Sequence, residues 1–247
     1  MITSVKNQQI KTWAKLKQRK YRKEQGLFIV EGEHLVEEAL KSDWELETIV
    51  IKENFEPNFD LSNHLVEAVS DHVFAHLSET KTPQGILAIV KMREEEEYKK
   101  NRLLILDAVQ DPGNLGTMIR TADAAGFDAI ILGGGTVDLY NDKVIRASQG
   151  SIFHIPIIEL SLETAVDQLK ESGVSICAST LERAVPVQTI EWPEQVGLIV
   201  GNEGSGVNQT LIEKSDLLVH IPIYGKAESL NVSIAAGVMM YQMQINR

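Results

Sequence analysis

The sequence predicts an α/β protein with two domains, and three observations support this fold class. The chain of 247 residues is longer than the roughly 150 residues of an average domain, and 43% of it is hydrophobic, enough for buried cores. Short apolar runs alternate with amphipathic stretches along its length, as in proteins whose strands and helices alternate. A run of mixed charge without apolar periodicity, residues 92–102, interrupts this pattern and marks the expected domain boundary.

The first 25 residues, 1–25, form a basic segment that we expect to be one amphipathic N-terminal helix. Its first 23 residues contain eight Lys or Arg and no acid, and Ile10, Trp13 and Leu16 recur at near-helical spacing. The net charge of −11 argues against a nucleic-acid partner, but the remaining 224 residues carry −19, so the average hides two different surfaces. A lysine-rich helix either contacts nucleic acid or presents a solvated face, and composition leaves both interpretations open.

Residues 26–95 are expected to form a small α/β domain with much parallel pairing. The pattern gives a strand, a helix, two strands, a helix and a strand, in that order: 27–30, 32–41, 48–51, 65–69, 71–77 and 85–90.

Residues 100–247 show the same alternation with stronger apolar runs, which predicts a second α/β domain on a mainly parallel sheet. Strands are expected at 103–107, 129–132, 154–158, 174–178, 197–200 and 217–221. Helices are expected at 114–125, 162–171 and 232–244.

The cysteine content and the N-terminal residues indicate a cytoplasmic protein that is not in a membrane. Cys177 is the only cysteine, so no intrachain disulfide forms, and no apolar stretch follows a charged N-terminus. No apolar run approaches the roughly 18 residues that a bilayer span needs. His72 and His76 are four residues apart, but no third ligand is near them in sequence, so we expect no metal.

Three glycine-bearing loops follow strands of the second domain, where open α/β sheets bind their ligands. The first loop, residues 107–120, breaks at Pro112-Gly113 and places Asn114 at the mouth of a helix, with Arg120 under two turns further along. Asn114 by itself is typical of a helix N-cap. Arg120 lies in a weakly charged helical stretch, so we expect this long cation to face a ligand.

The second and third loops carry signals that are weak when taken singly. Residues 198–207 include three glycines within six positions, which indicates a close approach of the backbone to a ligand or another chain. The spacing is neither that of a P-loop nor that of a dinucleotide fingerprint. In the third loop, residues 220–237, Ser229 and Asn231 precede a run of small residues, and by themselves they are typical helix caps.

Together, the three segments resemble, in order and spacing, the three motifs of the SpoU class of SPOUT-superfamily RNA 2′-O-ribose methyltransferases. The resemblance covers about residues 102–245 and includes Arg146-Ala-Ser-Gln-Gly-Ser-Ile-Phe-His-Ile-Pro156, which is similar to the family segment between the first two motifs. The segment Phe28-Ile-Val-Glu-Gly-Glu-His34 is similar to part of the substrate-binding domain that many members carry.

The resemblance implies a C-terminal α/β domain with a deep trefoil knot that binds S-adenosylmethionine, in a homodimer whose active sites are shared. The helix after Asn114 and the helix at 232–244 are then interface elements. The family's catalytic positions fall on Asn114, Arg120, Glu203, Ser229 and Asn231. Its cofactor-binding positions fall on Thr180, Gly201, Ile221 and Leu230.

Arg120 is difficult to assign as a base, because a guanidinium stays protonated at ordinary pH. We expect it to bind a substrate phosphate and to stabilise the developing alkoxide. The proton acceptor is left open between that phosphate and Glu203.

The activity that the resemblance implies is S-adenosylmethionine-dependent methylation of RNA, with 23S-type ribosomal RNA as the preferred substrate. Transfer RNA is the alternative substrate, and a catalytically inactive RNA-binding protein on the same fold is the alternative class. The complete set of five catalytic-type residues favours an enzyme. A nicotinamide-dependent oxidoreductase is disfavoured, because the sequence lacks the glycine fingerprint and an acidic ribose ligand at the right distance.

Overall fold

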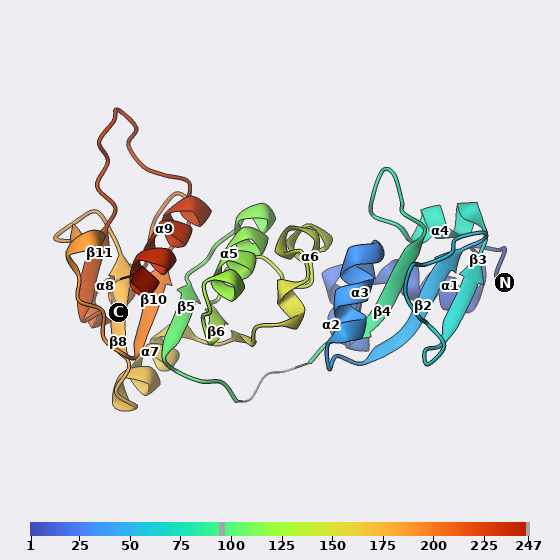
Figure 1. The fold of residues 1–247 in the computed structure, drawn as a ribbon, viewed down its shortest axis with the longest axis horizontal. Helices are drawn as coiled ribbons and strands as arrows, with labels where there is room; N and C mark the ends of the chain where they lie inside the picture. The colour runs from blue at the N-terminus through green and yellow to red at the C-terminus, as the bar shows by residue number, and fades with distance from the viewer. Residues whose placement is uncertain (94–96, 246–247) are drawn as a thin grey trace. The chain divides into compact units, whose positions relative to one another are not determined.

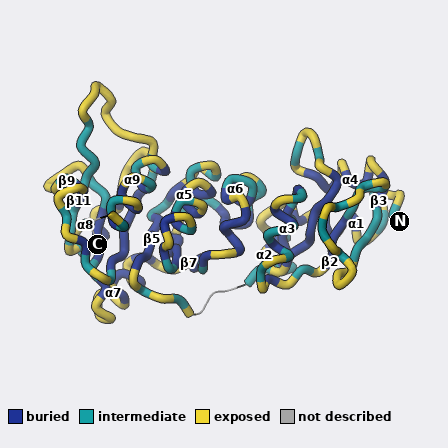
Figure 2. The backbone as a smooth tube through the Cα atoms, viewed as in Figure 1, coloured by how far each residue is buried: buried dark blue, intermediate teal, exposed yellow. Residues whose placement is uncertain are grey.

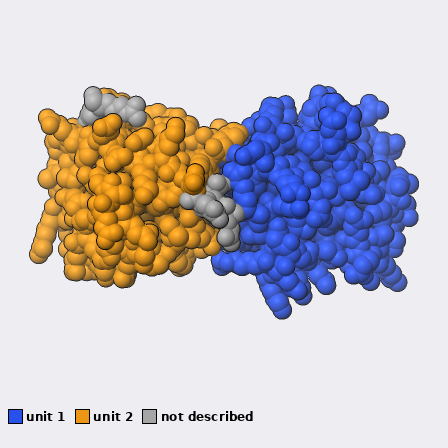
Figure 3. Space-filling view, turned by 90° about the horizontal axis from the view of Figure 1, so that it is seen from below, with its two compact units in different colours: residues 1–94, 138–153 blue, residues 95–137, 154–247 orange. Residues whose placement is uncertain are grey.

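The computed structural model describes residues 1–93 and 97–245, which form two compact units (Figure 3). The first unit comprises Met1–Glu94 and Asp138–Phe153, and the second comprises Glu95–Val137 and His154–Arg247. The charged run expected to mark the boundary includes residues 94–96, which lie outside the described residues. The segment Asp138–Phe153 lies within the range 100–247 expected for the second domain, but by its contacts it groups with the first unit.

The first unit is built on a four-stranded sheet with the strand order β1-β4-β2-β3. Its elements are α1 (Gln8–Lys15), α2 (Arg19–Gln25), β1 (Leu27–Glu31), α3 (Glu33–Lys41), β2 (Leu46–Lys52), β3 (Val66–Val69), α4 (Asp71–Leu77), β4 (Ile86–Lys91), α6 (Asp142–Ser148) and the 3₁₀ turn η1 (Ser151–Phe153). Strand β4 pairs antiparallel with both β1 and β2, whereas β2 and β3 pair in parallel. The expectation of much parallel pairing in this unit is therefore wrong.

Alternation along the strands of the first unit supplies two apolar faces. Leu27 and Leu87 join one core with Trp13 of α1 and Phe74 of α4. Residues one position further along face the other side, where Phe28 contacts the rings of Trp44 and Tyr140 at centroid distances of 5.9 and 4.6 Å. Helices α1 and α4 therefore cover one face of the sheet. The segment from 138 to 153 contributes aromatic residues to the other face.

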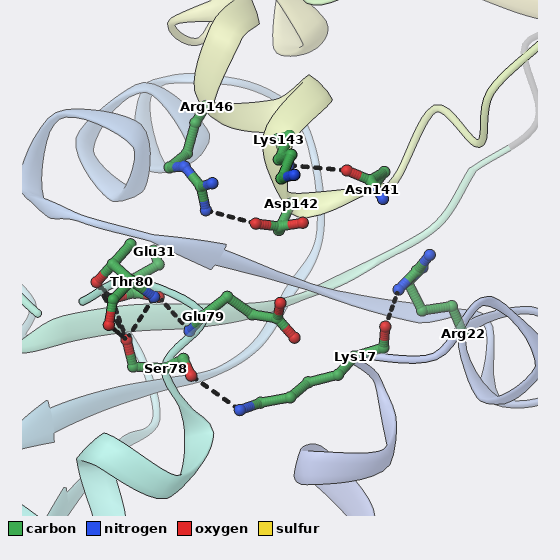
Figure 4. Close-up of polar contacts among 10 residues, drawn as sticks. All are labelled: Lys17, Arg22, Glu31, Ser78, Glu79, Thr80, Asn141, Asp142, Lys143 and Arg146. Carbon is green, nitrogen blue, oxygen red and sulfur yellow. Dashed lines mark hydrogen bonds and ion pairs between the residues drawn. The ribbon is translucent and has the colours of Figure 1, made fainter. Parts of the chain in front are cut away.

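The basic N-terminal segment forms two helices, α1 and α2, so the prediction of one helix is wrong. The chain turns between them because the buried Arg22 guanidinium donates to the carbonyl oxygens of Leu16 and Lys17, at 2.8 and 3.0 Å. Carbonyl oxygens at the end of a helix lack donors within the helix, and the Arg22 side chain supplies those donors. Arg22 also forms a buried ion pair with Asp138. Two of the eight basic residues of the segment, Arg22 and Lys17, lie among the polar contacts in Figure 4.

A second polar group in Figure 4 fixes the loop after α4. The carboxylate of Glu31 accepts hydrogen bonds from the hydroxyls of Ser78 and Thr80, both at 2.6 Å, and from the N–H of Glu79 at 3.0 Å. The ammonium of Lys17 donates to the carbonyl of Ser78 at 2.8 Å. The charged groups of Glu31 and Lys17 are thus committed to local structure.

The second unit is built on a seven-stranded sheet with the order β7-β6-β5-β10-β8-β11-β9, and every adjacent pair is parallel. The expected mainly parallel sheet is therefore confirmed. Its elements are β5 (Arg102–Leu106), α5 (Pro112–Ala124), β6 (Ala129–Leu132), β7 (Ile157–Glu159), α7 (Leu162–Glu171), β8 (Ser175–Ser179), β9 (Val185–Pro186), the 3₁₀ turn η2 (Val187–Thr189), β10 (Val196–Val200), α8 (Gln209–Lys214), β11 (Leu217–His220) and α9 (Val232–Ile245).

Helices cover both faces of this sheet (Figure 1). Leu103, Ile105 and Ile199 face α7 and α8 in one buried cluster. Helices α5 and α9 pack together, with Gly237 against Thr121, and they bury an apolar stripe that includes Met118 and Met240. The inner strands β5 and β10 are buried throughout (Figure 2). The trefoil knot implied by the resemblance stays a prediction.

Among the described residues, no helix is both long enough and apolar enough to cross a membrane.

Candidate active site

The candidate site is formed by loops that follow four adjacent strands of the second unit. Strands β5, β10, β8 and β11 are neighbours in this order, and all run in parallel. Their carboxyl ends therefore lie at one edge of the sheet, where open α/β proteins bind ligands. The three motif loops start at β5, β10 and β11, and Thr180 follows β8 directly.

The side chain of Asn114 joins these loops. Its amide nitrogen donates to Oε1 of Glu203 at 3.1 Å, and its carbonyl oxygen accepts from Nδ2 of Asn231 at 3.1 Å. The three residues come from the loops after β5, β10 and β11, and they are separated by up to 117 positions in the sequence. Three of the five residues expected to be catalytic are therefore hydrogen-bonded in a chain.

Glu203 is held by three donors. In addition to the amide of Asn114, the main-chain N–H groups of Asp111 and Gln110 donate to its carboxylate at 3.0 and 3.2 Å. Partial burial raises the pKa of Glu203, but these hydrogen bonds, first among them the one from Asn114, together outweigh that effect. The pKa therefore lies below its ordinary value, and the carboxylate stays ionised.

Helix caps hold two of these residues in place. Helix α5 begins at Pro112, and Asp111 caps it by accepting from the N–H of Asn114 at 2.8 Å. Asn114 is therefore inside the first turn rather than the cap, which leaves its side chain available to Glu203 and Asn231. Asn231 does cap a helix, because its oxygen accepts from the N–H of Ser233 at 2.9 Å, while its nitrogen serves Asn114.

Two polar residues that the sequence analysis did not single out tie the first and second loops together. The amide of Asn202 donates to the carbonyl of Ala108 at 2.8 Å, and Asp107 accepts from the N–H of Asn208 at 2.7 Å. Ala108 has a φ of 55°, a left-handed conformation that is unfavourable for a residue with a Cβ. Their positions in the sequence are a signal that could have identified them. Asp107 follows the buried strand β5 directly, and Asn202 follows the buried strand β10 with one residue between them.

Gly201 is required by close packing of the backbone. A Cβ at this position would lie 2.1 Å from the carbonyl carbon of Gly206 and 2.2 Å from the nitrogen of Val207. Asn202 and Gly206 bond to each other through both main-chain groups, at 3.0 Å each, so the loop closes on itself above Gly201. No side chain fits there.

The structure leaves Arg120 and Ser229 outside the hydrogen-bonded chain. Arg120 is exposed on α5, and within residues 1–93 and 97–245 no carboxylate pairs with it. Ser229 is exposed in the loop between β11 and α9, which projects from the second unit as the orange-red arm in Figure 1.

Of the four residues expected at the cofactor, Thr180, Gly201 and Ile221 directly follow β8, β10 and β11, and Leu230 lies in the loop before α9. Thr180 donates its N–H to the carbonyl of Val219 at 3.0 Å. Gly201 is buried, Ile221 is half-buried, and Leu230 is 38% exposed. The main chain of residues 223–230 makes no hydrogen bond to any other described residue, so its donors and acceptors are available to a ligand.

No group of three or more His, Cys, Asp or Glu side chains that could hold a metal is found among the described residues. His72 lies on α4, where its Nδ1 contacts the hydroxyl of Ser70 at 3.1 Å.

The lowered pKa of Glu203 predicts how the stability of the loops depends on pH. A carboxylate with a depressed folded-state pKa stabilises the protein fully above its ordinary value of 4.5, and this contribution is lost as pH falls through the folded-state value. We expect Glu203→Gln to be less stable than the wild type at neutral pH, and the difference to shrink as the medium is acidified. Urea unfolding between about pH 7 and pH 3 measures it.

Glu163→Gln, on the exposed face of α7, removes a charge without removing such hydrogen bonds and serves as the control. A difference between wild type and Glu203→Gln that stays constant across this pH range would contradict the assigned role of the carboxylate.

Comparison with known proteins identifies the family. Residues 101–241 match the SpoU rRNA Methylase family, and residues 7–88 match the MRM3-like substrate binding domain. The chain is 48% identical over 244 residues to 23S rRNA (guanosine(2553)-2'-O)-methyltransferase RlmP of Bacillus subtilis (strain 168), covering 98% of each protein.

Two solved structures also resemble the chain over its length. An AdoMet-bound rRNA methyltransferase from Sinorhizobium meliloti is 33% identical with a TM-score of 0.89, and the match covers 99% of this chain and 97% of that one. An RNA 2'-O ribose methyltransferase is 32% identical with a TM-score of 0.86, covering 100% and 98%. The motif loops and these matches agree, and the chain belongs to the SpoU rRNA methylase family.

Proposed function

We propose that this protein methylates a ribose 2′-hydroxyl of ribosomal RNA, with S-adenosylmethionine as the methyl donor. The observation that carries the proposal is the hydrogen-bonded chain Asn231–Asn114–Glu203, which ties the three motif loops together in a member of this family. We infer a cytoplasmic location from this activity, since ribosomal RNA is available there.

The two parts of the chain divide the work in this proposal. Residues 26–95, with the basic segment 1–25, recognise the RNA, and residues 100–247 carry the chemistry. The matches to a substrate-binding domain over residues 7–88 and to a methylase family over residues 101–241 support this division.

The loops at the sheet edge suit S-adenosylmethionine. Unpaired main-chain groups of residues 223–230 can hydrogen-bond an adenine edge, and Leu230 and Ile221 offer apolar surface to its ring. Gly201 and Thr180 border the same edge. When bound, the cofactor supplies an electrophilic methyl group on a sulfonium.

The protein's own residues then align the ribose and manage charge. Arg120, unpaired and exposed, binds the phosphate next to the target ribose and stabilises negative charge on the 2′-oxygen. Asn114, Ser229 and Asn231 position the ribose. Glu203 holds Asn114 and the start of α5, and its low pKa makes it a weak base. The hydroxyl proton therefore passes to the neighbouring phosphate or to water as the C–O bond forms, so that the 2′-oxygen carries the partial negative charge that Arg120 stabilises.

Replacement of the arginine tests this assignment. We expect Arg120→Ala to lower the methylation rate by roughly 100-fold or more, the usual cost of losing a charge-stabilising donor. The affinity for S-adenosylmethionine, measured by calorimetry, should stay within a few-fold. Arg120→Lys should recover only part of the rate, since an ammonium lacks the bidentate fork. Near-normal turnover of Arg120→Ala would rule out the role.

We further propose that the target is a guanosine of 23S rRNA, the substrate that the name of the Bacillus subtilis relative specifies. Mapping 2′-O-methylation in RNA from cells with and without the gene tests the proposal. We expect one guanosine of 23S rRNA to lose its methyl group in the deletion strain and to regain it on complementation. A changed position in transfer RNA would support the alternative substrate, and no change anywhere would support an inactive RNA-binding protein.

A second copy of the chain is the proposed partner of α9. Ile234, Val238, Tyr241 and Ile245 are 54%, 40%, 47% and 70% exposed, and they recur on one side of the helix. An apolar stripe of this kind marks an interaction surface. A symmetric dimer would bury the stripe against its own copy.

Val238→Glu tests the dimer, because it puts a charge at the centre of the stripe. We expect light scattering after size exclusion to give the mass of one chain for this variant and of two chains for the wild type. Thr164→Glu, on the exposed face of α7, is the matched control and should remain dimeric. A dimeric Val238→Glu would show that α9 is not the interface.

A further inference from the structure

The basic residues of the N-terminal segment divide into two groups. Arg22 and Arg19 both contact Asp138, which Arg19 reaches at 3.6 Å, and Lys17 donates to the carbonyl of Ser78. These three side chains serve the fold of the first unit. The other five are exposed, and none forms an ion pair with a described carboxylate: Lys6, Lys11, Lys15, Lys20 and Lys23.

Two of the unpaired lysines share one aromatic ring. The ammonium of Lys15, in the last turn of α1, lies 5.3 Å from the ring centroid of Tyr21, and that of Lys20 lies 5.7 Å from it. Both distances are within the range of a cation–π contact. Tyr21 itself lies in α2 and is half-buried, so its side chain is partly open to solvent.

This arrangement lacks an anion. Two ammonium groups at one ring repel each other, and exposed cation–π contacts are weak, about 0.5–1 kcal/mol each. Glu24 is the only acidic residue in the segment and, within the described chain, it forms no ion pair. Phosphates beside the ammonium groups would offset the repulsion, and each flexible lysine stem can leave the ring as it follows its phosphate.

We propose that Lys15, Lys20 and Tyr21 form a binding site for one unpaired RNA nucleotide. The base stacks on the ring of Tyr21, and the two ammonium groups contact the flanking phosphates. Aromatic rings bordered by cations are the usual platform for unstacked bases in RNA recognition. This inference rests on the proposed function, because it names how the substrate RNA is held away from the reacting ribose.

The experiment measures the affinity of the full-length protein for an unmethylated 23S rRNA transcript over a series of salt concentrations. We expect Tyr21→Leu to weaken binding by roughly 5- to 100-fold, the effect of losing one base–aromatic stack. Tyr21→Trp should bind the transcript as tightly as the wild type. An affinity retained in this variant also shows that the site tolerates substitution. The affinity for S-adenosylmethionine should be unchanged in both variants.

The lysines are tested by their effect on salt dependence. Lys15→Gln and Lys20→Gln should each lower the slope of log affinity against log salt by about 0.7, the value for one contact to a single strand. Lys41→Gln is the matched control, because Lys41 is an exposed lysine of the same unit that Glu37 and Glu38 already neutralise. Its slope should equal that of the wild type.

The outcomes separate this inference from the proposed function. If the wild type methylates and binds the transcript but Tyr21→Leu binds equally well, the stacking site is overturned and the proposed function stands. Unchanged slopes for both lysine variants would overturn the phosphate contacts in the same way. If the wild type neither binds nor methylates ribosomal RNA, the proposed function itself fails.

Discussion

The geometry of the site depends on the carboxamide of Asn114. An amide is both donor and acceptor, so one side chain can give a hydrogen bond to the carboxylate of Glu203 and take one from the amide of Asn231. A carboxylate in this position would face Glu203 with a like charge, and a hydroxyl would be too short to reach both partners. A single residue near the start of α5 therefore fixes the positions of the three motif loops relative to one another.

The parallel sheet makes this junction possible. Strands β5 and β10 are adjacent although about 90 residues separate them, and only parallel pairing brings both loops to the same edge. Gly201 lets the second loop close within contact distance of its own backbone, and Asn202 and Asp107 then tie it to the first loop. Each of these ties satisfies a backbone group that a loop would otherwise leave to solvent.

The continuous apolar runs of the second unit predict its inner strands, because strands buried on both faces leave a strong signal in sequence. The edge strands are predicted less well, since β7 covers only the end of the expected 154–158 and the two-residue β9 was not expected. Direction and partners were not predictable in the first unit, where alternation marks the faces of β1 and β4 but does not distinguish antiparallel from parallel pairing. The contacts of the segment from 138 to 153 with the first unit were unpredictable for a related reason. Its affinity for the first unit comes from Asp138 meeting Arg22 and Tyr140 meeting Phe28, contacts that span more than 110 residues.

Net charge is a second property for which the sequence is insufficient, because the structure decides which charged side chains are paired. The −11 of the whole chain and the +8 of its first 23 residues describe composition, whereas binding depends on which cations remain unpaired. The fold uses Arg19, Arg22 and Lys17 internally, so a count of basic residues overstates the charge that a ligand meets. What remains is a smaller set of lysines, two of which are gathered at one tyrosine ring. An RNA can recognise the arrangement of these lysines rather than the total number of basic residues.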